Sequence, residues 1–167
     1  MSTLRETIVV RTPFAQAADL VENFFVGQAE KDGTIVMRLA APGGGLGLRA
    51  FSVEHDVTAT FRRERGPSET IVFALHWESA DGGPFPIFDG TLTVAQDEDY
   101  GTCRLILEGS YTPPGWVAGA VFDAVVGSKI AEATARELLA RMSTFLSAGY
   151  DEIERRKRMR DLLAHGN

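Results

Sequence analysis

The fold is decided by residues 102–148, TCRLILEGSYTPPGWVAGAVFDAVVGSKIAEATARELLARMSTFLSA. Residues 105–111 alternate in hydropathy as a β-strand does, and this segment ends at the Pro-Pro-Gly turn of residues 113–115. From Trp116 onwards the apolar residues recur at helical spacing, over a longer segment than any other helical pattern in the chain. A sheet that passes directly into one long helix predicts a curved sheet wrapped around that helix, with a cavity between the two.

The segments upstream predict the rest of an antiparallel sheet. Four of them alternate in hydropathy and are joined by Gly-, Pro- or Asp-containing turns, which is typical of a meander: residues 34–41, 48–64, 70–78 and 87–95. The glycine-rich stretch 42–45 is predicted to be a hairpin loop, because a phosphate cradle would open a helix and the next segment reads as a strand.

The amino-terminal region adds one strand and one helix. Residues 4–11 are rich in β-branched side chains and predict a strand. Thr12 is expected to cap the following helix, with Pro13 at its first position, and the helical spacing of apolar residues continues to about residue 26. The order strand, helix, antiparallel strands and long helix predicts an α+β fold in which one sheet face packs on helices.

The long helix is expected to present one stripe to the sheet. With about 100° between successive residues, the stripe contains Val117, Val121, Ala124, Ser128, Ala131, Ala135, Leu139, Met142 and Leu146. Gly149 is expected to break or bend the helix near its end. We therefore divide the chain into a ligand-binding domain, residues 1–149, and a charged helical extension, residues 150–167.

Composition excludes several classes of function. The chain has 167 residues and a net charge of −6, whereas a nucleic-acid-binding protein normally carries a basic face. It contains no run of 18 apolar residues, so no membrane insertion is expected. Its start does not resemble a signal peptide, and a single cysteine, Cys103, fits a reducing compartment. These features predict a cytoplasmic protein in which Cys103 is an ordinary strand residue.

The chain resembles the START-like, or SRPBCC, superfamily of helix-grip proteins over roughly residues 4–148. The resemblance rests on the element order and on Trp77, PIFDG at 86–90, LILEGSY at 105–111, PPG at 113–115 and Asp123. The most similar members are small bacterial proteins of undefined role. The resemblance implies a hydrophobic cavity between a curved sheet and the last helix. It implies no catalytic residues, because the superfamily shares a shape and not one active site.

Three functional hypotheses follow. The first is a carrier or sensor that binds a small hydrophobic molecule, such as a lipid, a polyketide or an aromatic compound, without a cofactor. The second is a cyclase or aromatase that folds a polyketide chain in the same cavity. The third is a homodimer formed through the apolar start of the long helix, residues 117–126. The apolar inward faces and the lack of paired catalytic groups favour the first hypothesis over an enzyme.

The candidate ligand-binding residues lie on the predicted inward faces of the strands and of the long helix. They are Val53, His55, Phe61, Phe73, Trp77, Leu92, Leu107, Tyr111, Val121, Ala124, Ser128 and Ala131. Trp77 and Tyr111 join a polar group to a large apolar body, so each would either bind a ring or carbonyl or simply fill the core. The small side chains of the helix would either leave room for a ligand or allow tight packing on the sheet.

His55 is the candidate catalytic residue. Alternation places it on a strand face with Val53 and Val57, where an imidazole can orient a ligand or transfer a proton. The pattern favours a half-buried histidine bonded to a neighbouring strand or to water, because buried polar groups normally have partners. His76 is expected to point outward and His165 lies in the tail, so the three histidines predict no metal site.

Two charged groups are interpreted as solvated surfaces. Glu78, Asp89 and Glu108 alternate outward, so they are expected on the convex face and not in an acid–base cluster. The tail of residues 151–163 mixes acidic and basic side chains, which is typical of an exposed helix end and does not indicate an anion-binding patch.

Overall fold

A computed structural model describes residues 2–27, 35–43, 51–67, 70–82, 86–112 and 124–164. Within these ranges the side chains of residues 2, 35–43, 51–56, 65, 124–128 and 130 are outside the description. The elements are β1 (Ser2–Val10), α1 (Phe14–Val26), β2 (Ile35–Gly43), β3 (Phe51–Arg65), β4 (Thr70–Ser79), β5 (Ile87–Gln96), β6 (Cys103–Thr112) and α2 (Ala124–Ala164). The fold is α+β, as the sequence predicts.

The six strands form one antiparallel sheet in the order β1-β6-β5-β4-β3-β2. Strands β2 to β6 are neighbours in chain order, so the predicted meander is confirmed. Strand β1 joins the other side of β6, and α1 therefore connects the two edge strands of the sheet.

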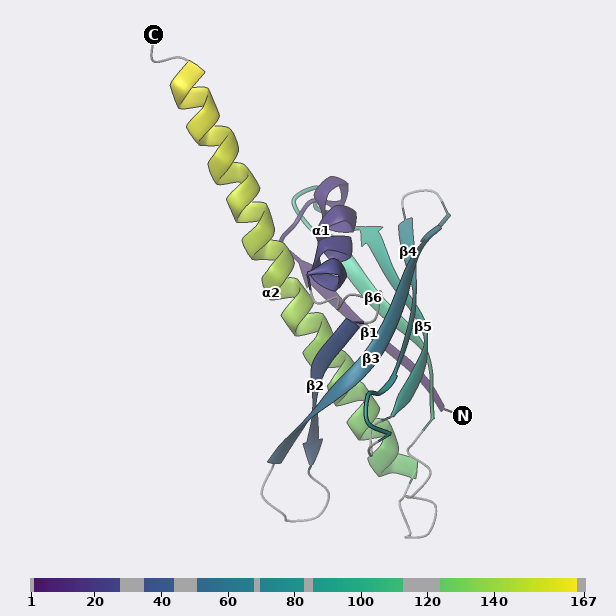
Figure 1. Cartoon of the computed structure of the whole chain (residues 1–167). Coiled ribbons are helices and arrows are strands. Elements are labelled where there is room, and N and C mark those ends of the chain that lie inside the picture. Colours follow the sequence, from purple (N-terminus) through teal and green to yellow (C-terminus); the bar gives the residue numbers. More distant parts are fainter. Residues whose placement is uncertain are drawn as a thin grey trace.

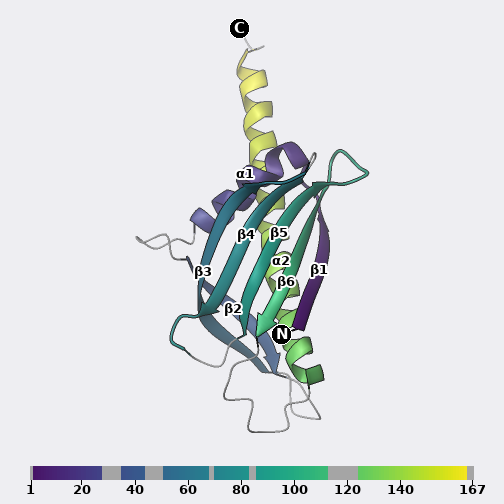
Figure 2. The same ribbon diagram turned by 90° about the vertical axis from the view of Figure 1, so that its right-hand side faces the viewer.

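Helix α2 lies across the concave face of the curved sheet (Figures 1 and 2). It contacts both edge strands, β1 and β2, as well as β6. One straight helix can touch both edges of a six-stranded sheet only because the sheet curls around it. Helix α1 packs against α2 and β5, at the far end of the sheet from the start of α2 (Figure 1).

The core lies between the concave face and the two helices. Strand residues alternate between buried and more exposed positions, as in the sequence Phe73, Leu75 and Trp77 of β4. Phe88, Leu92 and Val94 of β5 and Cys103, Leu105, Leu107 and Tyr111 of β6 are buried in the same way. On α2 the stripe Ala131, Ala135, Leu139, Met142 and Leu146 is buried, so the inward faces predicted for these described residues are confirmed.

Two local predictions for the first third of the chain were wrong. Helix α1 begins at Phe14 with extended Pro13 as its N-cap, and Thr12 does not cap it. The Thr12 side chain is instead fully buried, where its hydroxyl has no hydrogen-bond partner among the described residues. Pro42 and Gly43 belong to β2, since their backbones pair with Ser52 and Phe51. The strand therefore extends into the stretch predicted as a loop, and residues 44–45 lie outside the described residues.

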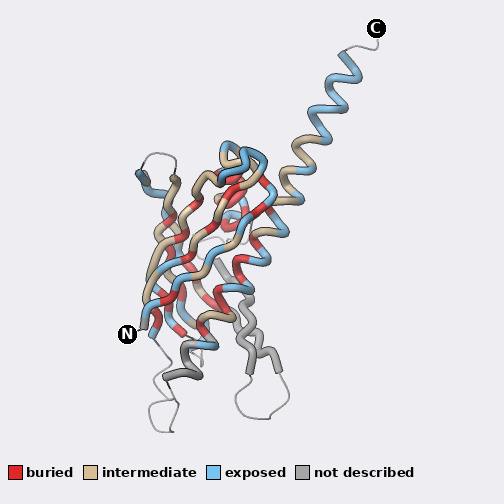
Figure 3. The backbone as a smooth tube through the Cα atoms, turned by 180° about the vertical axis from the view of Figure 1, so that it is seen from behind, coloured by how far each residue is buried: buried red, intermediate tan, exposed pale blue. Residues whose placement is uncertain are grey.

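Gly149 does not break α2, which continues without interruption to Ala164. A Cβ atom at this position would lie 2.7 Å from Cδ2 of Leu20 in α1. The glycine therefore permits the close approach of the two helices, and the loss of helix propensity is offset by their packing. The C-terminal part of α2 extends beyond α1 and the sheet (Figures 1 and 3).

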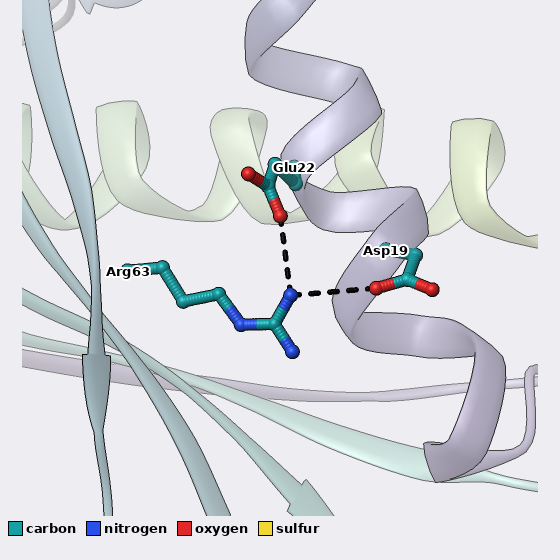
Figure 4. A network of polar contacts seen from close by, with 3 residues as sticks. All are labelled: Asp19, Glu22 and Arg63. Carbon is teal, nitrogen blue, oxygen red and sulfur yellow. Dashed lines mark hydrogen bonds and ion pairs between the residues drawn. The ribbon is translucent and has the colours of Figure 1, made fainter.

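Ion pairs attach α1 to the sheet, and the connection between β1 and α1 to α2. Arg63 of β3 reaches towards α1 and contacts Asp19 Oδ1 at 3.4 Å and Glu22 Oε2 at 3.2 Å (Figure 4). Arg11, just after β1, contacts Asp151 of α2 at 3.0 Å. These groups are largely exposed, so the ion pairs orient α1, and most of its stabilisation comes from its buried apolar face.

Candidate functional site

A row of three aromatic side chains crosses the concave face of β4, β5 and β6. Trp77 pairs with Phe88, and Phe88 pairs with Tyr111. The rings of Trp77 and Phe88 are stacked, with centroids 4.1 Å apart and planes inclined by 16°. All three residues are at most 3% exposed. The row lies where β4 and β6 end and β5 begins, at the end of the sheet beside the start of α2 (Figure 1).

Two glycines allow Phe88 to lie flat against the sheet. Gly90 and Gly109 pair with each other on β5 and β6. A Cβ atom would lie 2.7 Å from Phe88 Cζ at Gly90 and 2.8 Å from it at Gly109. Alternation along β5 and β6 puts both glycines on the inward face, but it does not show that they make room for this ring. A glycine two residues after an inward aromatic residue, opposite another glycine, is the signal that could have shown it.

The indole of Trp77 carries the most unusual polar atom of this face. Nε1 is buried and has no hydrogen-bond partner among the described residues. Leaving a buried donor unpaired costs about 1–3 kcal/mol. A molecule with an acceptor oxygen that reached this N–H would recover that energy, while its apolar part would contact aromatic rings.

The inward face of α2 carries small side chains and a second buried polar atom without a partner among the described residues. Ala131 and Ala135 are buried, and between them Thr134 is 1% exposed with its hydroxyl unpartnered among the described residues. Sequence reasoning missed Thr134, because it lies off the stripe of apolar residues. Ala124 and Ser128 are on α2 with undescribed side chains, and Val121 lies outside the described residues.

The other predicted ligand-binding residues lie in the packed part of the core. Phe73, Leu92 and Leu107 are completely buried. Phe61 stacks on Phe25 of α1, with ring centroids 4.8 Å apart, and so contributes to the contact between β3 and α1. The structure thus places Trp77 and Tyr111 in one row, and Phe61, Phe73, Leu92 and Leu107 are not part of that row.

His55 and Val53 lie on β3 beyond the aromatic row. Ala59 pairs with Trp77, and His55 is four residues earlier, opposite Leu39 of β2. At about 3.3 Å per residue, His55 is roughly 13 Å along the strand from the row. His55 is two residues before Val57 and four before Ala59, so alternation along β3 puts its backbone position in line with these two buried residues. Its side chain is outside the description. One ligand could contact both His55 and Trp77 only if it were about that long.

The charged residues predicted to be solvated do lie on the outer surface. His76 Nδ1 is 3.3 Å from Asp89 Oδ2, and the Asp89 side chain is 75% exposed. Glu108 contacts Arg5 at 3.2 Å in a similarly exposed pair. The residues that the structure describes contain no group of three or more side chains suited to hold a metal ion.

Cys103 is a residue of strand β6, as predicted, and the structure shows that it is buried. Burial, together with the nearby Asp97 carboxylate, raises the pKa of its thiol to about 11. A thiol with this pKa is protonated at neutral pH and is a poor nucleophile. Asp97 itself has a lowered pKa: burial alone would raise it, but hydrogen bonds from Thr102, the Glu98 backbone and Arg104 outweigh this effect.

Two grooves lined by described residues lie off the concave face, along α2. The first is next to the end of α1 and is lined by Phe24, Gly27, Arg141, Thr144, Phe145 and Ala148. The second continues along α2 and is lined by Ala148, Asp151, Glu152, Arg155, Arg158, Met159 and Leu162. Among the described helices, none is long and apolar enough to cross a membrane.

Comparisons with known proteins give similarity of structure only. No family model matches the sequence, and no curated protein matches it. The chain is similar to the solved structure of TTHA0849 from Thermus thermophilus, with 12% identity, a TM-score of 0.44, and coverage of 89% of this chain and 99% of that one. It is also similar to Mll3558 from Rhizobium loti, with 18% identity, a TM-score of 0.39 and the same coverage.

Proposed function

We propose that this chain is a START-like, helix-grip protein that binds a small hydrophobic molecule between the curved sheet and α2, in the cytoplasm. The observation that carries this proposal is the buried indole N–H of Trp77, which lies within an aromatic row and has no hydrogen-bond partner in the part of the chain that the structure describes. The ligand class that fits is a flat or elongated apolar molecule with one acceptor oxygen, such as a ketone or ester group. Its oxygen would accept from Trp77, and its body would lie against Phe88 and Tyr111.

The position of the row supports this reading. The row is at the end of the sheet beside the start of α2. Ala131 and Ala135, further along α2, present small side chains to the core. The residues deeper in the sheet are large and fully buried, including Phe73, Leu92 and Leu107. A ligand would therefore enter at the Trp77 end and not at the α1 end, where Phe25 and Phe61 close the core.

A pair of matched probes tests this proposal. A naphthyl ketone and the naphthyl hydrocarbon with a methylene in place of the carbonyl would be titrated against the full chain by fluorescence. Trp77→Phe should weaken ketone binding about tenfold, the effect of one hydrogen bond of about 1.4 kcal/mol. Hydrocarbon binding should be nearly unchanged. Trp116→Phe, the same substitution at the other tryptophan, serves as the control. Failure of both probes and of long-chain fatty acids to bind would contradict the proposal.

A cyclase or aromatase is the alternative function, and the observation that favours it is the position of His55 along β3. A backbone position in line with Val57 and Ala59 makes His55 a candidate proton-transfer group for a ligand long enough to reach it from Trp77. His55→Ala should then abolish turnover of a poly-β-ketone chain and leave its binding nearly intact. Unchanged turnover would remove this assignment, and binding without any turnover in the unmodified chain would leave the carrier function.

A further inference from the structure

The end of α2 carries apolar side chains that the fold itself does not cover. We call residues 151–164 the arm; it is helical throughout and mostly exposed (Figure 3). On it Met159 is 58% exposed, Leu162 71% and Leu163 76%, and Phe145 near its base is 41% exposed. Ion pairs of Glu152 with Arg155 and Arg156 and of Glu154 with Lys157 stabilise the helix. They do not account for the three large apolar side chains.

Phe145, Met159 and Leu162 belong to one stripe with the spacing of a helix pair, and Leu163 is not part of it. Its members, Phe145, Ala148, Glu152, Arg155, Met159 and Leu162, are spaced alternately by three and four residues. The two surface grooves follow this stripe and share Ala148. They run from the end of α1 to Leu162, so one continuous track extends along the arm and its base.

We propose that the occupant of this track is the arm of a second copy, packed antiparallel to the first. In a two-fold register centred between residues 153 and 154, Phe145 meets Leu162 of the second copy and Ala148 meets Met159. Glu152 then meets Arg155 at the centre, and each pairing occurs twice. In this register Phe145 contacts the apolar Leu162, the small Ala148 leaves room for Met159, and the opposite charges of Glu152 and Arg155 lie next to each other.

The charge order along the arm selects this orientation. Asp151, Glu152 and Glu154 lie at the base, and the five cations among residues 155–160 lie further out. An antiparallel pair places the acidic base of each copy beside the basic outer part of the other, whereas a parallel pair would align like charges. The tip of the second arm, Leu162 and Leu163, would reach the groove that Phe24, Gly27 and Phe145 line beside α1.

Sedimentation velocity of the full chain over a range of concentrations tests the assembly. We expect a dimer that dissociates on dilution. Met159→Glu should raise its dissociation constant by about tenfold or more, because a methionine that the dimer would bury is replaced by a charge. Ala164→Glu places the same side chain on the opposite face of the arm and should leave the dimer intact. A monomer at all concentrations would overturn the proposal, and a monomer that binds anionic lipid vesicles through the arm would identify a membrane surface as the occupant instead.

Disulfide trapping tests the register independently of ligand binding. Native Cys103 is buried, so an introduced thiol is the reactive one. Ala148→Cys and Met159→Cys proteins, when mixed under mild oxidation, should form a mixed disulfide dimer. Each alone should not, since the two identical positions lie about 16 Å apart in this register at 1.5 Å per residue. Efficient self-crosslinking of Met159→Cys would show a parallel pair and contradict the proposal.

Discussion

Gly149 of α2 lies against Leu20 of α1 so closely that a methyl group on the glycine would be 2.7 Å from Leu20 Cδ2. This contact sets the distance between the two helices at the point where α2 leaves the body of the protein. It also explains why a residue of low helix propensity is found in the interior of a 41-residue helix.

Gly149→Leu should therefore lower the free energy of unfolding by about 2 kcal/mol, because its side chain cannot fit beside Leu20. Gly149→Ala should have a much smaller effect, since the end of the Leu20 side chain can move and the helix gains propensity. Urea unfolding followed by circular dichroism measures both. The double variant Gly149→Leu with Leu20→Ala should recover part of the loss, and no recovery would show that the contact is not the cause.

The paired glycines Gly90 and Gly109 beneath Phe88 leave less room for a larger side chain than Gly149 does. A Cβ atom at Gly90 would lie 2.3 Å from the Glu108 carbonyl oxygen, and one at Gly109 would lie 2.4 Å from the Asp89 carbonyl oxygen. These neighbours are backbone atoms that cannot move aside, so Gly90→Ala or Gly109→Ala should each cost about 3 kcal/mol or more. Gly101→Ala, in the exposed β5–β6 turn, is the control in the same measurement. A loss of less than about 1 kcal/mol at Gly90 would contradict the close packing.

The raised pKa of Cys103 predicts a loss of stability at high pH. The native thiol titrates at about 11, whereas the ordinary value is 9.0. Between these values the unfolded chain has lost the proton and the native protein has kept it, so stability falls as pH rises through this window. Relative to Cys103→Ala, the unmodified protein should lose up to about 2 kcal/mol between pH 9 and 11. Parallel stability curves for the two proteins would show that the thiol is not protected.

The ion pairs of Arg63 should contribute little. Its guanidinium contacts Asp19 and Glu22 of α1, but all three side chains are at least 43% exposed (Figure 4). Arg63→Met should lower the free energy of unfolding by about 0.5 kcal/mol, and about 1 M salt should remove most of the difference. A salt-independent loss would indicate that the aliphatic part of Arg63, and not its charge, supports α1.

The sequence predicts the sheet well because inward and outward residues alternate strictly in β4, β5 and β6. It predicts α2 because its apolar stripe is long. Prediction from the sequence fails where the role of a residue depends on a contact with another residue that is distant in the chain. Gly149 has the local signal of a helix break, and only the approach of Leu20 explains its place. Thr12 has the local signal of a cap, but it is buried before α1 begins.

For the candidate site, alternation places Trp77 and Tyr111 on the inward face, and the structure brings them together with Phe88 in one row. Periodicity cannot show whether the indole N–H has a partner, because that depends on atoms from other elements. For the same reason the polar residue Thr134, which is off the apolar stripe, is found only in the folded chain.

The most direct measurement is the indole proton resonance of Trp77 in a ¹H–¹⁵N spectrum, assigned by comparison with Trp77→Phe. Addition of the naphthyl ketone should move this resonance downfield as the N–H forms a hydrogen bond, and the matching hydrocarbon should not move it in that way. If the ketone binds and the Trp77 resonance stays in place, the ligand lies elsewhere and the proposed role of the aromatic row is wrong.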